Sequence, residues 1–297
     1  MFDILFIGLS LSSILLLVAL GLAVTYGAMG IINMAHGEMV MLGAYVAVLA
    51  NTWLGANLLV AIPLAFVVTA LFGLVIEWLV VRRLYGRLLD TLLATWGIAI
   101  VLQQAIRLEF GLSFLGIHIK GLGSGLQNVP VPGALQGTVS VLGQDLNAYR
   151  IFIVVMTLLL TLATWAVMYR TSLGMKVRAI IANPQMAAAC GIDVKRTNAV
   201  SFALGSGLAG VAGVLMAGFK TVAPDMGATM VVDGFMVVVT GGVGSLFGTI
   251  AASGLLGEFN ALVAVISNDI IGRAAVFAVV IGVILVKPAG LFNFKGR

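Results

Sequence analysis

Long apolar segments separated by short polar ones recur along almost the whole chain. A helix needs roughly 20 mostly apolar residues to cross the hydrocarbon core of a bilayer. The pattern predicts nine helical segments, some of them half-spans broken by glycine, at residues 4–28, 39–50, 58–81, 91–108, 151–168, 199–219, 231–248, 249–266 and 271–286. The expected fold class is all-α. We expect a polytopic membrane protein with about eight to nine transmembrane or half-transmembrane helices, in one domain over residues 1–297.

Composition excludes the main alternatives to a membrane protein. Charged residues make up 9% of the 297 residues and hydrophobic residues 61%, whereas a soluble domain has about 25% charged residues. The mean hydropathy is +1.17, so a water-facing surface could not be covered. Intrinsic disorder is excluded as well, because it requires low hydrophobicity and high charge.

The basic residues predict an orientation, because positively charged loops stay in the cytoplasm. The first 81 residues contain no Lys or Arg, so we interpret the first segment as a retained span and not as a signal peptide. With the C-terminus inside, only five of the 16 basic residues fall outside or near the outer boundary, namely Arg107, Lys120, Arg150, Lys220 and Arg273. The N-terminus is then outside, or inside if the second segment is re-entrant.

Two connections are too long to be simple turns. Residues 111–150 form an outer loop rich in Gly and Pro, and residues 171–196 form a basic cytoplasmic loop. The second loop is predicted to hold two short helices, with Pro184 near a helix start and Gly191 just past a helix end. Short amphipathic helices beside a membrane indicate contact with another protein.

Polar residues inside spans are costly in lipid and are therefore candidates for function. The main cluster is Asn33, His36 and Glu38 between the first two segments, and capping of helix ends at the inner interface is an equally good interpretation. Gln103 and Gln104 lie in the fourth segment, where interhelical hydrogen bonding is the commoner explanation.

Three further acids lie near or within spans. Glu258 interrupts the eighth segment. Asp233 either faces an entrance or is a helix N-terminal acid favoured by the helix dipole. For Glu77 we favour an ion pair with the adjacent arginines, Arg82 and Arg83.

The sequence offers little for catalysis, metal binding or nucleotide binding. One cysteine, Cys190, and two histidines, His36 and His118, predict neither a disulfide framework nor a metal centre, and no cofactor is expected. The glycine-rich run 241–245 indicates a tight turn or a re-entrant break, and it lacks the Gly-Lys-Ser/Thr ending of a phosphate loop. An intramembrane serine protease built on Ser206 and His118 is disfavoured, because Ser206 lies among glycines spaced for helix packing. The diffuse charge of +5 does not indicate a nucleic-acid partner.

Three motifs resemble the branched-chain amino-acid permease family of ABC importers. They are Asn33-Met34-Ala35-His36-Gly37-Glu38 with Met41-Leu42-Gly43-Ala44-Tyr45, the stretch from Ser172-Leu173-Gly174 to Gly191-Ile192, and the run from Met236 to Thr249. They occur in the family's order and cover most of the chain.

A further segment is similar to the urea permease branch of that family. It runs from Asp90-Thr91-Leu92-Leu93-Ala94-Thr95-Trp96-Gly97 to Gln103-Gln104, and Pro224-Asp225-Met226-Gly227 with Asp233 agrees with it. Two positions depart from the usual pattern: Leu88 stands where proline is usual and Ser245 where asparagine is usual.

The resemblance implies a subunit of a bacterial inner-membrane importer. Its expected partners are a second homologous permease subunit, two cytoplasmic ATPase subunits, a periplasmic solute-binding protein and the lipid bilayer. The resemblance assigns ATPase coupling to Leu173, Gly174, Arg178, Ala187, Ala188 and Gly191.

The expected solute is urea, with branched-chain amino acids or short amides as the alternative and a self-sufficient passive channel as a remote one. A neutral solute suits amide and hydroxyl groups, whereas an amino-acid carboxylate favours a cation or a helix N-terminus. The candidates for the solute path are Asn33, His36, Glu38, Thr95, Gln103, Gln104, Asp233 and Glu258.

Overall fold

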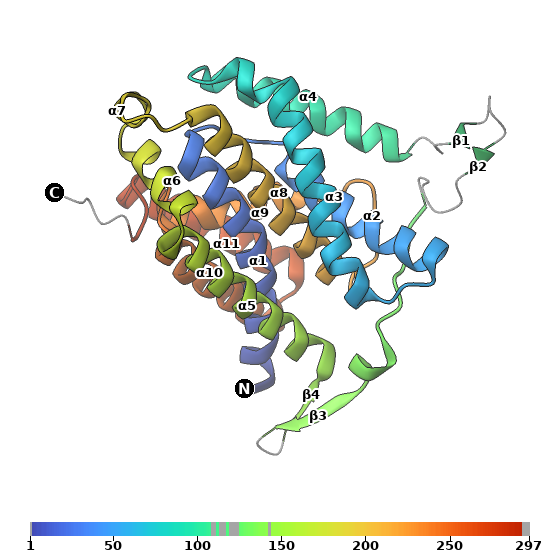
Figure 1. The fold of residues 1–297 in the computed structure, drawn as a ribbon. Coiled ribbons are helices and arrows are strands. Elements are labelled where there is room, and N and C mark those ends of the chain that lie inside the picture. The colour runs from blue at the N-terminus through green and yellow to red at the C-terminus, as the bar shows by residue number, and fades with distance from the viewer. Residues whose placement is uncertain (1, 108–110, 113–116, 119–124, 142–143, 293–297) are drawn as a thin grey trace.

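The computed structural model describes residues 2–107, 111–112, 117–118, 125–141 and 144–292, and these form a bundle of tilted helices (Figure 1). The helices are α1 (Phe2–Met29), α2 (His36–Leu54), α3 (Leu58–Leu79), α4 (Leu88–Arg107), α5 (Ala148–Arg170), α6 (Ser172–Ala182), α7 (Pro184–Ala189), α8 (Val194–Ala217), α9 (Met226–Gly241), α10 (Leu246–Ile266) and α11 (Asp269–Val286). Short 3-10 turns are η1 (Val81–Leu84) and η3 (Gly133–Leu135).

The membrane-spanning prediction is confirmed in outline. Among the described residues, seven helices are long and apolar enough to cross a membrane, and Met226–Gly241 and Ile270–Val286 are shorter apolar helices. The second segment is longer than predicted: α2 has 19 residues and ends where Gly55 adopts a left-handed conformation with φ 59°. It is therefore long enough for a complete crossing.

The predicted boundary between the seventh and eighth segments was wrong. The predicted segments meet at residue 248, but α9 ends at Gly241 and α10 starts at Leu246. The tight turn expected from the glycine-rich run 241–245 is confirmed at this place. Gly242 and Gly244 have φ values of 101° and 78°, which side chains with a Cβ rarely adopt. Hydropathy could not locate this turn, because apolar residues flank it on both sides.

Residues 111–150 include small antiparallel hairpins. β1 (Gly111–Leu112) pairs with β2 (Ile117–His118), and β3 (Thr138–Val141) pairs with β4 (Gln144–Asn147). In Figure 1 the β3–β4 hairpin lies at the bottom, at the opposite end of the bundle from α6 and α7 at the upper left. These strands are a minor exception to the all-α prediction.

Helix α8 forms the centre of the bundle and packs against α1, α2 and α3. Of its most apolar 18-residue window, 89% is buried. A Cβ atom added at Gly213 of α8 would lie 1.9 Å from the carbonyl oxygen of Val40 on α2. One added at Gly43 of α2 would lie 2.0 Å from the carbonyl oxygen of Gly210 on α8. The glycines predicted for packing therefore bring the backbones of α2 and α8 together.

Ser206 belongs to the same packing face. It is fully buried, and a Cβ atom added at Gly73 of α3 would lie 2.4 Å from its hydroxyl oxygen. Its position is that of a small residue at a helix crossing. The side chain of His118 lies outside the described residues.

We expect Gly213→Val to destabilise the protein by about 3 kcal/mol, because the added side chain must displace a backbone carbonyl. Thermal unfolding of the purified protein in detergent measures the change. The control is Gly254→Val within α10, where an added Cβ meets nothing within 4 Å. If the two variants were equally stable, the close contact of α2 with α8 would be contradicted.

Candidate functional site

The connection between α1 and α2 turns back into the bundle. Gly30 ends α1 with φ 64°, and the chain then runs to His36, whose Nε2 lies 3.1 Å from the carbonyl oxygen of Val18. Val18 precedes the end of α1, Met29, by eleven positions, which is about 16 Å along a helix. Helix α2 therefore begins beside the middle of α1 and not at its end.

The first turn of α9 meets the first turn of α2 at this point. A Cβ atom added at Gly37 would lie 2.0 Å from the carbonyl oxygen of Gly227, and one added at Gly227 would lie 2.6 Å from Oε2 of Glu38. The positive ends of two helix dipoles thus converge near the Glu38 carboxylate. Helix ends that meet inside a membrane protein are a common setting for a solute site.

Helix α4 contributes the polar side chains that face this carboxylate. Gln103 donates a hydrogen bond from Nε2 to Oε1 of Glu38, at 2.8 Å. The Thr95 hydroxyl accepts a hydrogen bond from the backbone N–H of Met34 at 3.1 Å and donates one to the carbonyl of Thr91 at 2.8 Å. Five of the eight predicted path residues are therefore together: Asn33, His36, Glu38, Thr95 and Gln103.

Several buried polar atoms in this cluster have no hydrogen-bond partner within the described part of the chain. They are Nδ2 of Asn33, Nδ1 of His36 and Oε2 of Glu38, and two turns further along α2 the hydroxyl of Tyr45 is unpartnered as well. A buried polar group left without a partner costs about 1–3 kcal/mol. A group of such atoms can hydrogen-bond a small polar solute or water. We call the cluster of Asn33, His36, Glu38, Tyr45, Thr95 and Gln103 the Glu38 site.

Tyr45 was missed by the sequence analysis as a site residue. It is only 1% exposed, although it lies in an apolar segment where a tyrosine could equally face the membrane. The sequence feature that could have identified it is its spacing of seven residues from Glu38. This spacing is two helical turns and puts both residues on one face of a helix.

The other three predicted path residues lie elsewhere. Gln104 is exposed on α4, one position beyond the face that carries Gln103. Glu258, on α10, lies against Gly8 of α1. Asp233, on α9, receives two hydrogen bonds from Nη2 of Arg273 on α11, at 2.7 and 2.8 Å. Asp233 is thus an ion-pair partner in the second turn of its helix and does not lie at the helix terminus.

The predicted cytoplasmic loop contains the two expected short helices, and each helix start has a side-chain cap. Thr171 accepts from the N–H of Gly174 at the start of α6, and Asn183 accepts from the N–H of Met186 at the start of α7. Asp193 likewise accepts from the N–H of Arg196 at the start of α8. These caps give the segment a defined shape.

The residues predicted for ATPase coupling divide between inward and outward positions. Gly174 and Ala187 are buried and Leu173 is half-buried, whereas Ala188 and Gly191 are exposed. Arg178 is also exposed, and it donates a hydrogen bond to the carbonyl of Met168.

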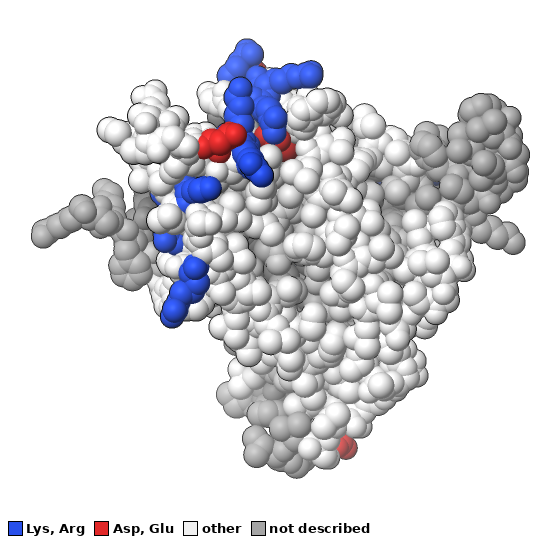
Figure 2. Space-filling view, in the orientation of Figure 1, with Lys and Arg blue, Asp and Glu red and all other residues white. Residues whose placement is uncertain are grey.

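Three large apolar side chains also project from α6 and α7, which the sequence analysis did not identify. Met175 is 59% exposed, Ile181 46% and Met186 62%. Exposed apolar side chains on a polar segment are typical of a protein contact. In Figure 2 the Lys and Arg side chains gather at the top of the molecule, where α3 turns into α4 and α8 starts, and continue down the left side, where α6 lies in Figure 1.

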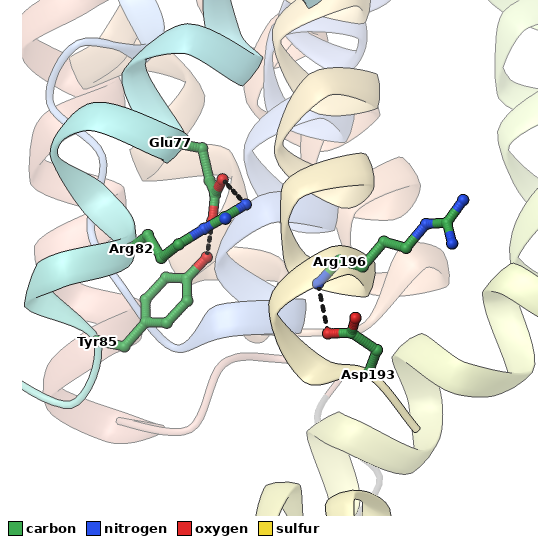
Figure 3. Close-up of polar contacts among 5 residues, drawn as sticks. All are labelled: Glu77, Arg82, Tyr85, Asp193 and Arg196. Atoms are coloured by element: carbon green, nitrogen blue, oxygen red, sulfur yellow. Dashed lines mark hydrogen bonds and ion pairs between the residues drawn. The ribbon is translucent and has the colours of Figure 1, made fainter. Parts of the chain in front are cut away.

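The interpretation of Glu77 is confirmed. Its carboxylate is fully buried and pairs with Arg82 at 2.9 Å, and the hydroxyl of Tyr85 donates a hydrogen bond to it at 2.5 Å (Figure 3). Burial, together with the hydrogen bond to Glu77, raises the pKa of Tyr85 well above its usual range. The tyrosine therefore remains a hydrogen-bond donor at physiological pH.

Among the described residues, no three His, Cys, Asp or Glu side chains lie close enough together to hold a metal ion.

Residues 4–287 match the protein family described as branched-chain amino acid transport system, permease component. The high-affinity branched-chain amino acid transport system permease protein BraD of Pseudomonas aeruginosa is 31% identical over 297 residues, which cover 96% of this chain and 94% of BraD. The corresponding permease protein LivH of Escherichia coli is 30% identical over 303 residues, with 97% and 94% covered. A probable LivH of Methanocaldococcus jannaschii is 26% identical, with 94% and 89% covered. No solved structure matches the chain.

We expect Thr95→Val to destabilise the protein by about 1–3 kcal/mol, because the N–H of Met34 loses its buried acceptor. Thermal unfolding in detergent again measures the change. The control is Thr161→Val on α5, where the buried hydroxyl has no partner among the described residues; this variant should be as stable as the parent. Equal effects of the two substitutions would contradict the attachment of α4 to the turn before α2.

Proposed function

The chain belongs to the family of permease components of branched-chain amino acid ABC transport systems, and on this basis we propose that it forms part of the solute path of a binding-protein-dependent importer. Like its relatives, it is a multi-pass membrane transport subunit. It is not an enzyme. ATP is hydrolysed by separate cytoplasmic subunits, since the sequence has no phosphate-binding loop.

In this proposal α6 and α7 form the contact with an ATPase subunit. The capped helices, the exposed Met175 and Met186 and the surrounding basic residues support this assignment. The same basic end then faces the cytoplasm, in accordance with the positive-inside rule. The β3–β4 hairpin, at the opposite end of the bundle, then lies on the periplasmic side, where a solute-binding protein docks. A second, homologous permease and a second ATPase complete the complex in the inner membrane.

The Glu38 site is the proposed part of the solute path within this chain. The single observation that carries this assignment is the concentration of unpartnered, buried polar atoms where the first turns of α2 and α9 meet. Asp233, another candidate for the solute path, already forms an ion pair with Arg273. The Glu38 site can therefore offer hydrogen bonds to a solute without breaking an ion pair.

We assign branched-chain amino acids as the solute, because the relatives with full-length similarity are named for this transport. The original expectation, urea, is retained as the second candidate, because one observation favours it. Within the described residues, the Glu38 site contains amide, hydroxyl, imidazole and carboxylate groups but no Lys or Arg, so a neutral hydrogen-bonding solute fits its chemistry.

Transport by the purified complex separates the two solutes. The permease, reconstituted in liposomes with its partner permease, ATPase subunits and binding protein, is supplied with labelled leucine or labelled urea. We expect ATP-dependent leucine uptake, which excess unlabelled isoleucine suppresses and excess urea does not. Uptake of urea alone would establish the second candidate, and uptake without ATP or binding protein would indicate a passive channel.

We expect Ala188→Glu to reduce the amount of ATPase that co-purifies with the permease by about tenfold or more, because an unpaired charge buried in an interface is strongly unfavourable. Ala188 is exposed in the permease alone, so folding should be unaffected. The matched control is Val139→Glu, which places the same charge on the exposed β3 strand at the other end of the molecule. Full retention of ATPase by Ala188→Glu would contradict the assignment of α7.

A further inference from the structure

A buried charged junction lies where α3 passes through η1 into α4. Glu77 near the end of α3 is fully buried, and Arg82 of η1 donates to both of its oxygens, from Nε at 3.2 Å and from Nη2 at 2.9 Å. Tyr85, just after η1, donates to the same carboxylate. This bidentate geometry with a third donor fixes the orientation of η1 relative to α3.

The junction also faces the cytoplasmic start of α8. Helix α3, which carries Glu77, packs along α8, and the side chain of Asn198 on α8 is buried. Asp193 is the N-cap residue of α8 and follows α7 by only a few residues. Figure 3 shows Glu77, Arg82 and Tyr85 on one side of the first turns of α8, with Asp193 at the start of that helix.

Helix α4 is attached to the bundle at its two ends and, between them, by the Thr95 hydroxyl, which accepts a hydrogen bond from the N–H of Met34. Its principal neighbours are η1 and α2, and only 22% of its most apolar window is buried. At the η1 end, the Thr91 hydroxyl donates to the carbonyl of Leu84 at 3.0 Å. Near the other end of α4, Gln103 donates a hydrogen bond to the Glu38 carboxylate. A change in the orientation of η1 would therefore act through α4 on the Glu38 site.

Stability of the fold alone would not require a buried ion pair between Glu77 and Arg82. A buried ion pair adds little net stability compared with well-packed apolar residues, whereas charges with defined partners fix one geometry. The pair also lies between the segment proposed to contact the ATPase and α4, whose most apolar window has the smallest buried share among the spans in the described part of the chain.

We propose that Glu77, Arg82 and Tyr85 are positioning residues that couple movement of the α6–α7 segment to α4, so that the state of the ATPase controls the Gln103–Glu38 contact. This inference rests on the proposed function, since it requires an ATPase on α6 and α7. It assigns the coupling to the junction beside the first turns of α8 (Figure 3), which lies outside the docking surface itself.

The test uses the complete importer in liposomes with two variants, Tyr85→Phe and the double variant Glu77→Gln/Arg82→Gln. Both leave the exposed surface of α6 and α7 unchanged, and the double variant leaves no unpaired buried charge. We expect ATPase binding and hydrolysis to stay within about twofold of the parent while the solute imported per ATP falls about tenfold, as for a typical coupling between two sites.

The matched control is Arg87→Gln. It removes the exposed ion pair between Arg87 and Asp90, close to the junction in sequence, and should leave the solute imported per ATP unchanged. An unchanged ratio in both junction variants, or loss of the ATPase from them, would overturn the proposal, because the junction would then be dispensable or part of the docking contact.

A distance measurement tests the junction without relying on solute uptake. Spin labels at exposed Arg83 and Lys195, in a Cys190→Ser background, report the distance between η1 and the start of α8. We expect the same distance in the nucleotide-free and vanadate-trapped complex of the parent, and different distances in the double variant. Equal distances in the double variant would refute the coupling. Absence of any solute uptake by the parent would instead count against the proposed function.

Discussion

Glycine at the contact points of α8 allows this helix to lie against α1, α2 and α3 at the same time. In a bilayer, helices gain no hydrophobic free energy by leaving lipid for one another, so their association depends on close packing and on polar contacts between them. On α8, Gly205 faces the carbonyl of Gly21, and Gly213 faces that of Val40. A methyl group at either position would push a neighbouring backbone away. The depth at which α2 can enter the bundle depends on these contacts, and so does the position of every polar group at its start.

The entry of α2 at mid-bundle explains why the Glu38 site is polar and only partly satisfied. His36 is inserted between α1 and α8, where its Nε2 meets the Val18 carbonyl and its ring packs beside Gly21. The chain around Asn33 has no helix of its own at this depth, so its backbone needs a partner from another helix. Thr95 provides one of these partners. The site thus follows from a helix that starts inside the protein, and its polar atoms would not be tolerated where lipid surrounds them.

The sequence was sufficient for features that depend on local pattern. Apolar length located the spans, Pro184 and Gly191 marked the short cytoplasmic helices, and the proximity of Glu77 to Arg82 in the chain indicated their pairing. It was insufficient where position depends on packing between distant segments. Glu38 and Gln103 are 65 residues apart, and no periodicity relates them. Gln103 and Gln104 were indistinguishable before the rotation of α4 was known, and the partner of Asp233 lies on another helix. The assignment of these residues to a solute path remains a prediction.

Burial divides the Glu38 site into a fixed half and a movable half. Asn33, His36 and Glu38 belong to the tightly packed region around α8, whose most apolar window is 89% buried, whereas Thr95 and Gln103 are carried by α4, for which the value is 22%. Moving α8 would separate backbones packed at the closest distances in the molecule, which is costly because packed interiors do not deform continuously. Moving α4 exchanges a few hydrogen bonds, each with a modest net free energy of about 1 kcal/mol. A change of access to the Glu38 carboxylate is therefore far less costly through α4 than through the core, and the charged junction at Glu77 lies at the end of α4 from which such a movement can be imposed.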